Sequence, residues 1–298
     1  MNKNPKISVL MPIFNEEDYI IEAIKSVINQ TFKEFELIVI DNGSSDKSVQ
    51  LIEEKISDNR VNLVQINEKG KNLAFNKGYE ISNGDWIILL AGDDLLPVDS
   101  LKSRYREVKN YNPFEKNIFA CGKYKSFSNL KKFNNIVVPK NKKKGIFTGG
   151  TIIFSKNIAN KIFPIPLELP NEDTWIHLFE KYLGDKLFHI SEIVLYYRIH
   201  KNNSQSRFVN YSKKSNMMHE RKKAYDIFLN NFGKRLSKKN KQNIKFQIKA
   251  ENYRYNKKIL KLIFANGLTL REKIKNIFYS NKLLYKIKIK FFSFFVGR

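Results

Sequence analysis

Short apolar runs of strand length recur through the first third of the chain. They are rich in β-branched and other apolar residues, as buried parallel strands are. The four runs cover residues 7–11, 36–40, 62–66 and 85–90. Between them, apolar residues recur with helical spacing over 20–28, 49–56 and 73–81. This alternation of strand and helix predicts a doubly wound parallel sheet with right-handed crossovers.

The residues that follow these strands are the first candidates for a ligand site. In doubly wound sheets, ligands bind beyond the carboxyl ends of the strands. The segments PIFNEE (12–17), DNGSSD (41–46) and AGDD (91–94) stand at these ends and gather acidic and amide groups at one edge. Asn15 and Asp46 could instead be helix N-caps, and Asn42-Gly43 a turn.

The adjacent pair Asp93 and Asp94 is harder to explain as loop structure. Two carboxylates at the end of a buried strand repel each other. A hard cation would relieve that repulsion and would also bind phosphate oxygens. We therefore favour a metal and diphosphate role for the pair over a loop-capping role.

The sequence lacks the motifs that are typical of Rossmann redox enzymes, P-loop proteins and serine hydrolases. The chain has no Gly-rich dinucleotide fingerprint, no Walker loop, no GxSxG elbow and no HExxH helix. The single cysteine, Cys121, excludes a disulfide framework and a multi-Cys zinc site, and we expect it to be a buried apolar residue. The remaining possibility is a nucleotide site that binds the diphosphate through a metal ion held by acidic side chains.

Positive charge is concentrated in the last third of the chain. There are 54 Lys and Arg against 29 Asp and Glu, a net charge of +25. Residues 207–298 contain 25 of these basic residues and only 4 acidic ones. A nearly neutral first part is thus followed by a basic part that should bind polyanions such as anionic lipid headgroups or nucleic acid. AT-rich coding could explain the lysines, but not the scarcity of acids.

The N-terminus has too few apolar residues for a signal peptide, and no apolar run approaches the ~18 residues that span a bilayer. We expect a cytoplasmic protein that is peripheral on the inner face of the cytoplasmic membrane.

At this point the chain resembles a known family, the inverting glycosyltransferases of family 2, which have the GT-A fold and use nucleotide-sugar donors. PIFNEEDYIIEAIKSVINQTF, IVIDNGSSDKS and NLAFNKGYEISNGDWIILLAGDDLLP match its motifs in order and spacing over residues 6–97. GIFTGGTIIFSK, LPNEDTWIHLFEKY and YYRIHKNNSQS match more weakly over 145–206. Ala91 stands where the family's common DxDD motif has its first Asp.

The resemblance implies a donor site. Asp41 would bind the base, most commonly uracil, Asp93 the ribose or the metal's water shell, and Asp94 would ligate Mn²⁺ or Mg²⁺. Lys71 would face the nucleotide, or be an ordinary solvated lysine. The other donor-site residues that the resemblance implies are Pro12, Phe14, Glu16 or Glu17, and Arg198 at the diphosphate.

The resemblance also implies the catalytic base. Asp173 would take the proton of the acceptor hydroxyl and Glu172 would orient it, although the pair could simply stabilise a helix N-terminus. His200 would complete the metal shell, but a single His after a strand is more often structural. Trp175 could stack on a sugar, and core packing is the favoured alternative.

Residues 207–298 show helical spacing, with a possible alternating strand at 285–291. Lysines and aromatics at the C-terminus suit an anionic membrane surface. The alternative is a charged outer face on helices that pack on the catalytic domain. We expect no nucleic-acid partner, because no nucleic-acid motif accompanies the charge.

Together these features predict an α/β GT-A fold, a Rossmann-like doubly wound mixed sheet with a basic helical C-terminal extension. We expect a nucleotide-sugar-binding half (1–110), an acceptor-binding half (111–206) and the extension (207–298). The predicted function is metal-dependent, inverting hexosyl or N-acetylhexosaminyl transfer from a UDP-sugar to a lipid-linked or growing surface glycan. A sugar nucleotidyltransferase, or a membrane or polyanion binder with a decayed transferase domain, remain as alternatives.

Overall fold

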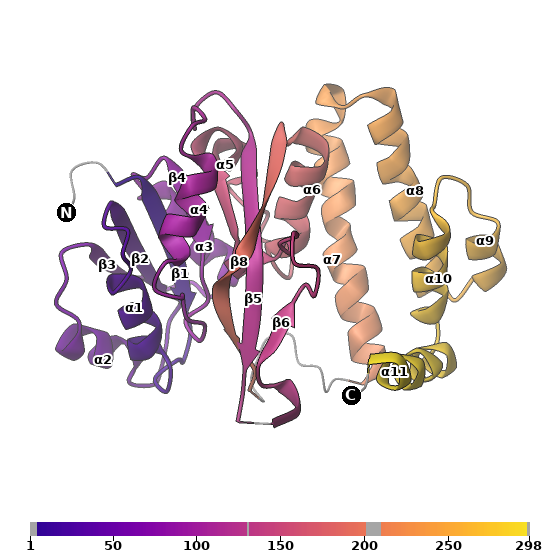
Figure 1. Ribbon diagram of the computed structural model, residues 1–298. Helices are drawn as coiled ribbons and strands as arrows, with labels where there is room; N and C mark the ends of the chain where they lie inside the picture. Colours follow the sequence, from indigo (N-terminus) through magenta and orange to yellow (C-terminus); the bar gives the residue numbers. More distant parts are fainter. Residues whose placement is uncertain (1–4, 130, 201–209, 297–298) are drawn as a thin grey trace. The chain divides into compact units, whose positions relative to one another are not determined.

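The computed structural model describes residues 5–129, 131–200 and 210–296 (Figure 1). The chain forms two compact units. The first comprises Met1–Leu167 and Phe179–Lys201, and the second Glu168–Leu178 and Asn202–Arg298. The three-part division expected from the sequence stays a prediction. Residues 201–206, the end of the last matching segment, lie outside the described residues.

The first unit is built on an eight-stranded sheet in the order β3-β2-β1-β4-β7-β5-β6, with β8 paired to β5. Strands β1 to β4 run parallel, β7 is antiparallel to β4 and β5, β6 is antiparallel to β5, and β8 is parallel to β5. The strands are β1 (Ile7–Ile13), β2 (Phe35–Asp41), β3 (Val61–Gln65), β4 (Trp86–Leu89), β5 (Ile118–Phe127), β6 (Ile136–Val138), β7 (Ile152–Ser155) and β8 (Lys186–Arg198). The predicted mixed sheet and its four parallel strands are confirmed.

Helices cover both faces of this sheet, as a doubly wound fold requires. On one face, α1 packs its Ile24 and Val27 into the same core as Val9 of β1. On the other face α3 comes so close that a Cβ at Gly78 would lie 2.6 Å from Ile40 Cδ1 and 3.6 Å from Leu10 Cδ2. The helices numbered up to six are α1 (Ile20–Ile28), α2 (Ser48–Lys55), α3 (Lys71–Glu80), α4 (Ser100–Val108), α5 (Lys156–Ile162) and α6 (Asp173–Leu183).

A buried arginine joins α4 to the later strands. The Arg104 side chain has no exposed surface and donates hydrogen bonds to the carbonyl oxygens of Gly150 (2.6 Å), Val194 (3.0 Å) and Ile152 (3.2 Å). Burial lowers its pKa to about 9. Cys121 of β5 is fully buried, as expected, and burial raises its thiol pKa to about 12.

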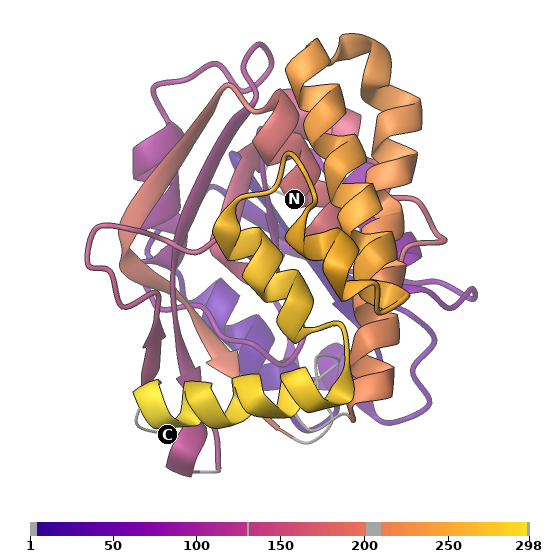
Figure 2. The same ribbon diagram turned by 90° about the vertical axis from the view of Figure 1, so that its right-hand side faces the viewer.

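The second unit is helical where it is described beyond residue 210. Its helices are α7 (Tyr211–Phe232), α8 (Lys238–Tyr255), α9 (Ile259–Ile263), α10 (Leu270–Phe278) and α11 (Lys282–Val296). The long helices α7 and α8 lie side by side (Figure 1). At the start of α7, the ring of Tyr211 is 5.7 Å from the ring of Tyr285 in α11, which Figure 2 shows in yellow.

The expected helical extension is confirmed, and the alternative of a strand at 285–291 is wrong. Asn281 caps α11, because its side-chain oxygen accepts a hydrogen bond of 2.9 Å from the backbone N–H of Leu284. Trp175 is buried against Phe228 and Phe232, with ring centres 5.9 and 6.2 Å away, so its favoured role in core packing is confirmed. No helix among the described residues is long and apolar enough to cross a bilayer.

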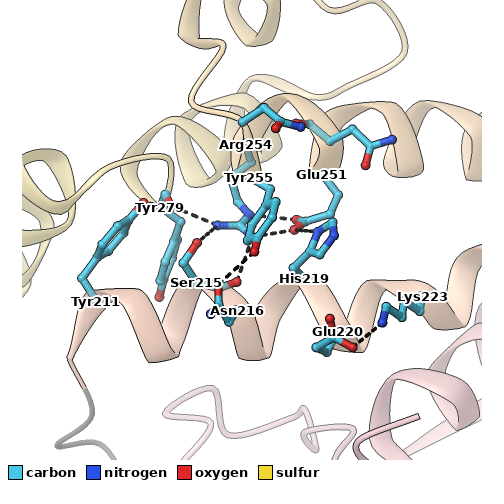
Figure 3. Close-up of polar contacts among 12 residues, drawn as sticks. Tyr211, Ser215, Asn216, His219, Glu220, Lys223, Glu251, Arg254, Tyr255 and Tyr279 are labelled. Atoms are coloured by element: carbon cyan, nitrogen blue, oxygen red, sulfur yellow. Dashed lines mark hydrogen bonds and ion pairs between the residues drawn. The ribbon is translucent and has the colours of Figure 1, made fainter. Parts of the chain in front are cut away.

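A buried ion pair organises the interior of the second unit (Figure 3). Arg254 and Glu251, both on α8, are bonded through two contacts of 2.8 and 2.5 Å. Arg254 also donates to the hydroxyl of Ser215 on α7 (2.9 Å) and to the carbonyl oxygen of Tyr279 (3.1 Å), while His219 lies 3.2 Å from Glu251. These bonds tie α7, α8 and the end of α10 together.

Candidate active site

The loop after β2 fixes the predicted base-binding carboxylate. Asp41 ends β2, is almost fully buried, and accepts a hydrogen bond from the Ser44 N–H at 3.2 Å on each carboxylate oxygen. Gly43 has a φ of 79°, the left-handed conformation that glycine adopts without strain. The Asn42 N–H donates to the Ile13 carbonyl at 2.9 Å, which holds the ends of β2 and β1 together.

The loop after β1 is bonded to the loop after β2. The Asn15 side chain accepts from the Ser45 N–H at 2.8 Å, and Glu17 accepts from the Lys47 N–H at 3.0 Å. Asp46 accepts from the N–H of Ser48, the first residue of α2, at 2.9 Å. The N-cap residues are Tyr19 for α1 and Lys47 for α2, so the alternative of Asn15 and Asp46 as N-caps is wrong. Asn15, Glu17 and Asp46 therefore have clear roles in shaping the two loops.

Two of the predicted base-pocket residues border this loop pair. Pro12 lies within β1, opposite Ile40 of β2. Phe14 is exposed, with the Lys69 ammonium 5.4 Å from its ring centre. An exposed aromatic ring at the carboxyl edge of the sheet offers a surface on which a nucleotide base can stack.

Three carboxylates crowd the next part of this edge. Asp94 is buried, and burial followed by the charge of Asp93 raises its pKa well above the ordinary value. Burial, followed by the charges of Asp93 and Asp46, raises the pKa of Glu16 to about 7. Lys71, the first residue of α3, is near enough to lower the pKa of Asp94 in part. Burial is the largest cause in both cases, and Arg198 acts in the opposite direction on both, so the ionised form of each carboxyl is disfavoured on balance.

The end of β8 meets this acidic group. Leu95 and Tyr196 exchange two backbone hydrogen bonds, of 3.0 and 2.8 Å, that place the last residues of β8 beside the acidic pair. The Arg198 N–H donates to Asp94 Oδ1 at 2.9 Å, and Arg198 Nε donates to the carbonyl of Asp93 at 2.8 Å. His200 Nε2 lies 2.9 Å from Asp93 Oδ2. The structure therefore brings Asp93, Asp94, Arg198 and His200 together.

Two further residues of α1 and its start belong to this cluster and were not foreseen. The Arg198 guanidinium makes an ion pair of 2.6 Å with Glu22 and lies 4.6 Å from the ring centre of Tyr19. The Tyr19 ring is 5.0 Å from that of His200. Glu22 and Arg198 are 176 positions apart, so no local pattern could have linked them.

The donor chemistry of this cluster fits a divalent cation. The described residues contain no ready-made group of three or more His, Cys, Asp or Glu side chains around an ion position. However, the pair of adjacent carboxylates, one of them buried with a raised pKa, provides the hard oxygen ligands that Mn²⁺ or Mg²⁺ prefers, and a cation would favour the ionised form of both. A nucleotide diphosphate would supply further oxygens.

The predicted catalytic base opens α6 and belongs to the second unit. Asp173 is the first residue of α6 and accepts a hydrogen bond from Asn171 Nδ2 at 3.3 Å. Glu172 is buried, and its carbonyl oxygen accepts from the Ile176 N–H at 2.9 Å. Asp173 is thus the more accessible carboxylate of the two. Their roles as base and orienter stay predictions, as do the other predicted ligand contacts.

Comparisons with known proteins identify the family. The model of the glycosyl transferase family 2 matches residues 8–163, just over half of the chain. An uncharacterized glycosyltransferase of Haemophilus influenzae is 40% identical over 102 residues, which cover 34% of this chain and 41% of that protein. Glycosyltransferase GlyG of Streptococcus pneumoniae is 31% identical over 105 residues, 35% of each chain. The chain thus matches about two fifths or less of the length of these relatives.

Solved structures share the fold. S. aureus TarS 1–349 in complex with UDP-GlcNAc has a TM-score of 0.64 at 18% identity, over 92% of this chain and 79% of that one. The mannosyltransferase PcManGT from Pyrobaculum calidifontis, in complex with GDP-Man and Mn²⁺, has a TM-score of 0.56 at 17% identity, over 76% and 65% of the two chains. The chain belongs to glycosyl transferase family 2, and the predicted GT-A fold is confirmed.

Proposed function

We propose that this protein is a metal-dependent, inverting glycosyltransferase that moves a hexosyl or N-acetylhexosaminyl group from a UDP-sugar to a glycan hydroxyl. The observation that carries this proposal is the adjacent carboxylate pair Asp93 and Asp94 at the carboxyl edge of the sheet, of which Asp94 is buried. Family membership and the ligands named for the two solved relatives support the same class of donor.

Asp41 and the acidic pair would bind different parts of the sugar donor. Asp41, held by the Ser44 N–H, would accept a hydrogen bond from the base, for which we favour uracil. Asp94, with Asp93 and His200, would hold Mn²⁺ or Mg²⁺ beside the diphosphate. When bound, the cation supplies positive charge that stabilises the departing diphosphate. Arg198, whose guanidinium lies against Asp93, would add a second positive charge there.

Transfer is a single displacement at the anomeric carbon. The acceptor oxygen forms a bond to this carbon while the bond to the diphosphate oxygen breaks, and its electron pair leaves with UDP. The proton of the acceptor hydroxyl passes to the Asp173 carboxylate, with Glu172 as orienter. General-base assistance of this kind typically contributes about 10² to 10⁴-fold to the rate.

The acceptor we propose is a lipid-linked or growing surface glycan, so the protein would serve polysaccharide biosynthesis. A peripheral position on the inner face of the cytoplasmic membrane follows from this proposal and agrees with the +25 net charge.

A panel of nucleotide sugars tests the proposal. UDP-glucose, UDP-galactose, UDP-GlcNAc and GDP-mannose are each incubated with the protein in Mn²⁺, in Mg²⁺ and in chelator, and free UDP or GDP is measured. We expect UDP release from one or more UDP-sugars, only with metal. Release of pyrophosphate from UTP and a sugar 1-phosphate, without this hydrolysis, would instead identify a nucleotidyltransferase. No turnover and no nucleotide binding in any condition would favour a decayed domain.

A further inference from the structure

The short helix α9 in the second unit exposes an unusual amount of apolar surface. Leu260 is 72% exposed, Ile263 44% and Phe264, directly after the helix, 77%, whereas Leu262 is fully buried and anchors the helix. Single exposed apolar residues are ordinary, but three within five positions form a continuous apolar tip.

A pocket with basic walls opens beside this tip. It has a volume of about 370 Å³, and its lining residues come from α8, α9 and the turn that follows α9. Lys249 comes from α8 and Lys261 from α9, and each ammonium lies 5.8 Å from the ring centre of Tyr253. Phe264 lines the pocket and also belongs to the exposed tip. The remaining lining residues are Phe246, Ala250, Ala265 and Asn266.

Acidic side chains do not balance these two lysines. From residue 236 to the end, the sequence contains two acids, Glu251 and Glu272. Glu251 is buried and paired with Arg254. Glu272 accepts hydrogen bonds from the Thr269 N–H at 2.8 Å and from Gln247 Nε2 at 2.8 Å. The two lysines of the pocket therefore suit a negatively charged group, and the neighbouring tip suits an apolar one.

We propose that this pocket and the tip of α9 bind an anionic phospholipid at the bilayer surface. The lipid phosphate would lie between Lys249 and Lys261, and Leu260, Ile263 and Phe264 would enter the outer part of the acyl region. A nucleic acid would match the charge but would leave the apolar tip in water. The proposal deepens the peripheral location given above by naming the surface, and it requires no sugar donor for its test.

Vesicle sedimentation of the full chain tests this site. We expect binding to vesicles of phosphatidylcholine with phosphatidylglycerol, weakened by salt, and poor binding to phosphatidylcholine alone. The double variant Lys249→Gln/Lys261→Gln should lower partitioning to the anionic vesicles by about tenfold. Leu260→Ser/Phe264→Ser should lower it by a similar factor, about tenfold, and this loss should persist at high salt.

Matched controls separate the site from general charge and apolarity. Lys245→Gln/Lys257→Gln removes two exposed lysines of the same unit that do not line the pocket. Phe114→Ser removes an exposed aromatic of the first unit. Both controls should bind anionic vesicles much more tightly than the site variants, and all variants should keep the wild-type melting temperature, because every changed side chain is exposed.

Soluble headgroups distinguish a lipid from a free phosphate. Glycerol phosphate and inorganic phosphate, titrated against the protein, should bind far more weakly than the anionic vesicles. Equal losses in site and control variants would overturn the proposal. Binding of soluble phosphate without vesicle binding would overturn it too, in favour of a free anion. Since the readout is sedimentation, its failure leaves the transfer reaction untouched.

Discussion

The carboxylate of Asp94 lowers the stability of the folded protein, and its position suits a role in binding a cation. Its carboxylate is buried next to Asp93, and both features raise its pKa, so the ionised form is disfavoured in the folded protein. Without a bound ligand, a neutral side chain at this position would make the folded protein more stable. The carboxylate is useful once it can bind a cation.

Asp94→Asn should therefore separate stability from activity. The amide keeps an oxygen for the Arg198 N–H, so at pH 8 the free energy of unfolding should remain equal or rise. Metal-dependent release of UDP should fall by about 10³-fold, because the cation loses a ligand. Urea denaturation and the hydrolysis assay measure the two effects. Glu54→Gln, an exposed change on α2, is the control and should alter neither. Wild-type release of UDP by Asp94→Asn would show that Asp94 is not a ligand of the metal ion.

Asp173→Asn should affect the chemical step alone. The variant should bind UDP with wild-type affinity and transfer sugar at least about 10²-fold more slowly, which is the signature of a lost base. Glu172→Gln is the matched comparison and should lose less. Near wild-type turnover in Asp173→Asn, with a large loss in Glu172→Gln, would exchange the two roles.

At the scale of elements, burial decides which parts of the fold the sequence reveals. Strand β1 lies inside the sheet, and its residues from Ile7 to Met11 are all buried, so the sequence there is apolar except for Ser8. Strand β8 is only partly buried and mixes charged and aromatic positions, and it pairs in parallel with β5 about 70 residues earlier. Such pairing leaves no local signal, so the sheet beyond β4 could not be derived from the sequence.

Arg104 on α4 is one of these long-range connections, and its removal should destabilise the first unit. Arg104→Met leaves the carbonyls of Gly150, Ile152 and Val194 without this donor in a dry interior. We expect a loss of about 2–4 kcal/mol in the free energy of unfolding, measured by urea denaturation. Lys102→Met changes an exposed residue of the same helix and should cost less than about 0.5 kcal/mol. Equal stability of the two variants would contradict the structural role of Arg104.

Because of Lys222 on α7, the stability of the second unit should change with pH in the alkaline range. Burial lowers its pKa to about 8 from 10.5, although Glu251 and Glu272 act in the opposite direction. Between these two values the unfolded chain binds the proton and the folded chain does not, so stability contributed by this group rises with pH. Lys222→Met should be more stable than wild type by about 1–2 kcal/mol at pH 7, and the difference should vanish near pH 10.5. A difference that is constant with pH would refute this assignment.

At the scale of the whole molecule, the sequence predicts which loops form the site but not how their partners are arranged. Asp41, Asp93 and Asp94 follow parallel strands, and topology alone places them on one edge. Arg198 and His200 could be named only through the family resemblance, and the backbone bonds between Leu95 and Tyr196 explain their position. Tyr19 and Glu22 emerge only from the three-dimensional packing.

Calorimetric titration of UDP is the most direct test of the central claim, that the acidic pair holds a cation for a nucleotide diphosphate. The account predicts that the wild-type protein binds UDP with Mn²⁺ present, binds GDP more weakly, and loses affinity by at least about tenfold in chelator or in Asp94→Asn. UDP affinity that is the same with Mn²⁺, with chelator and in the variant would contradict it.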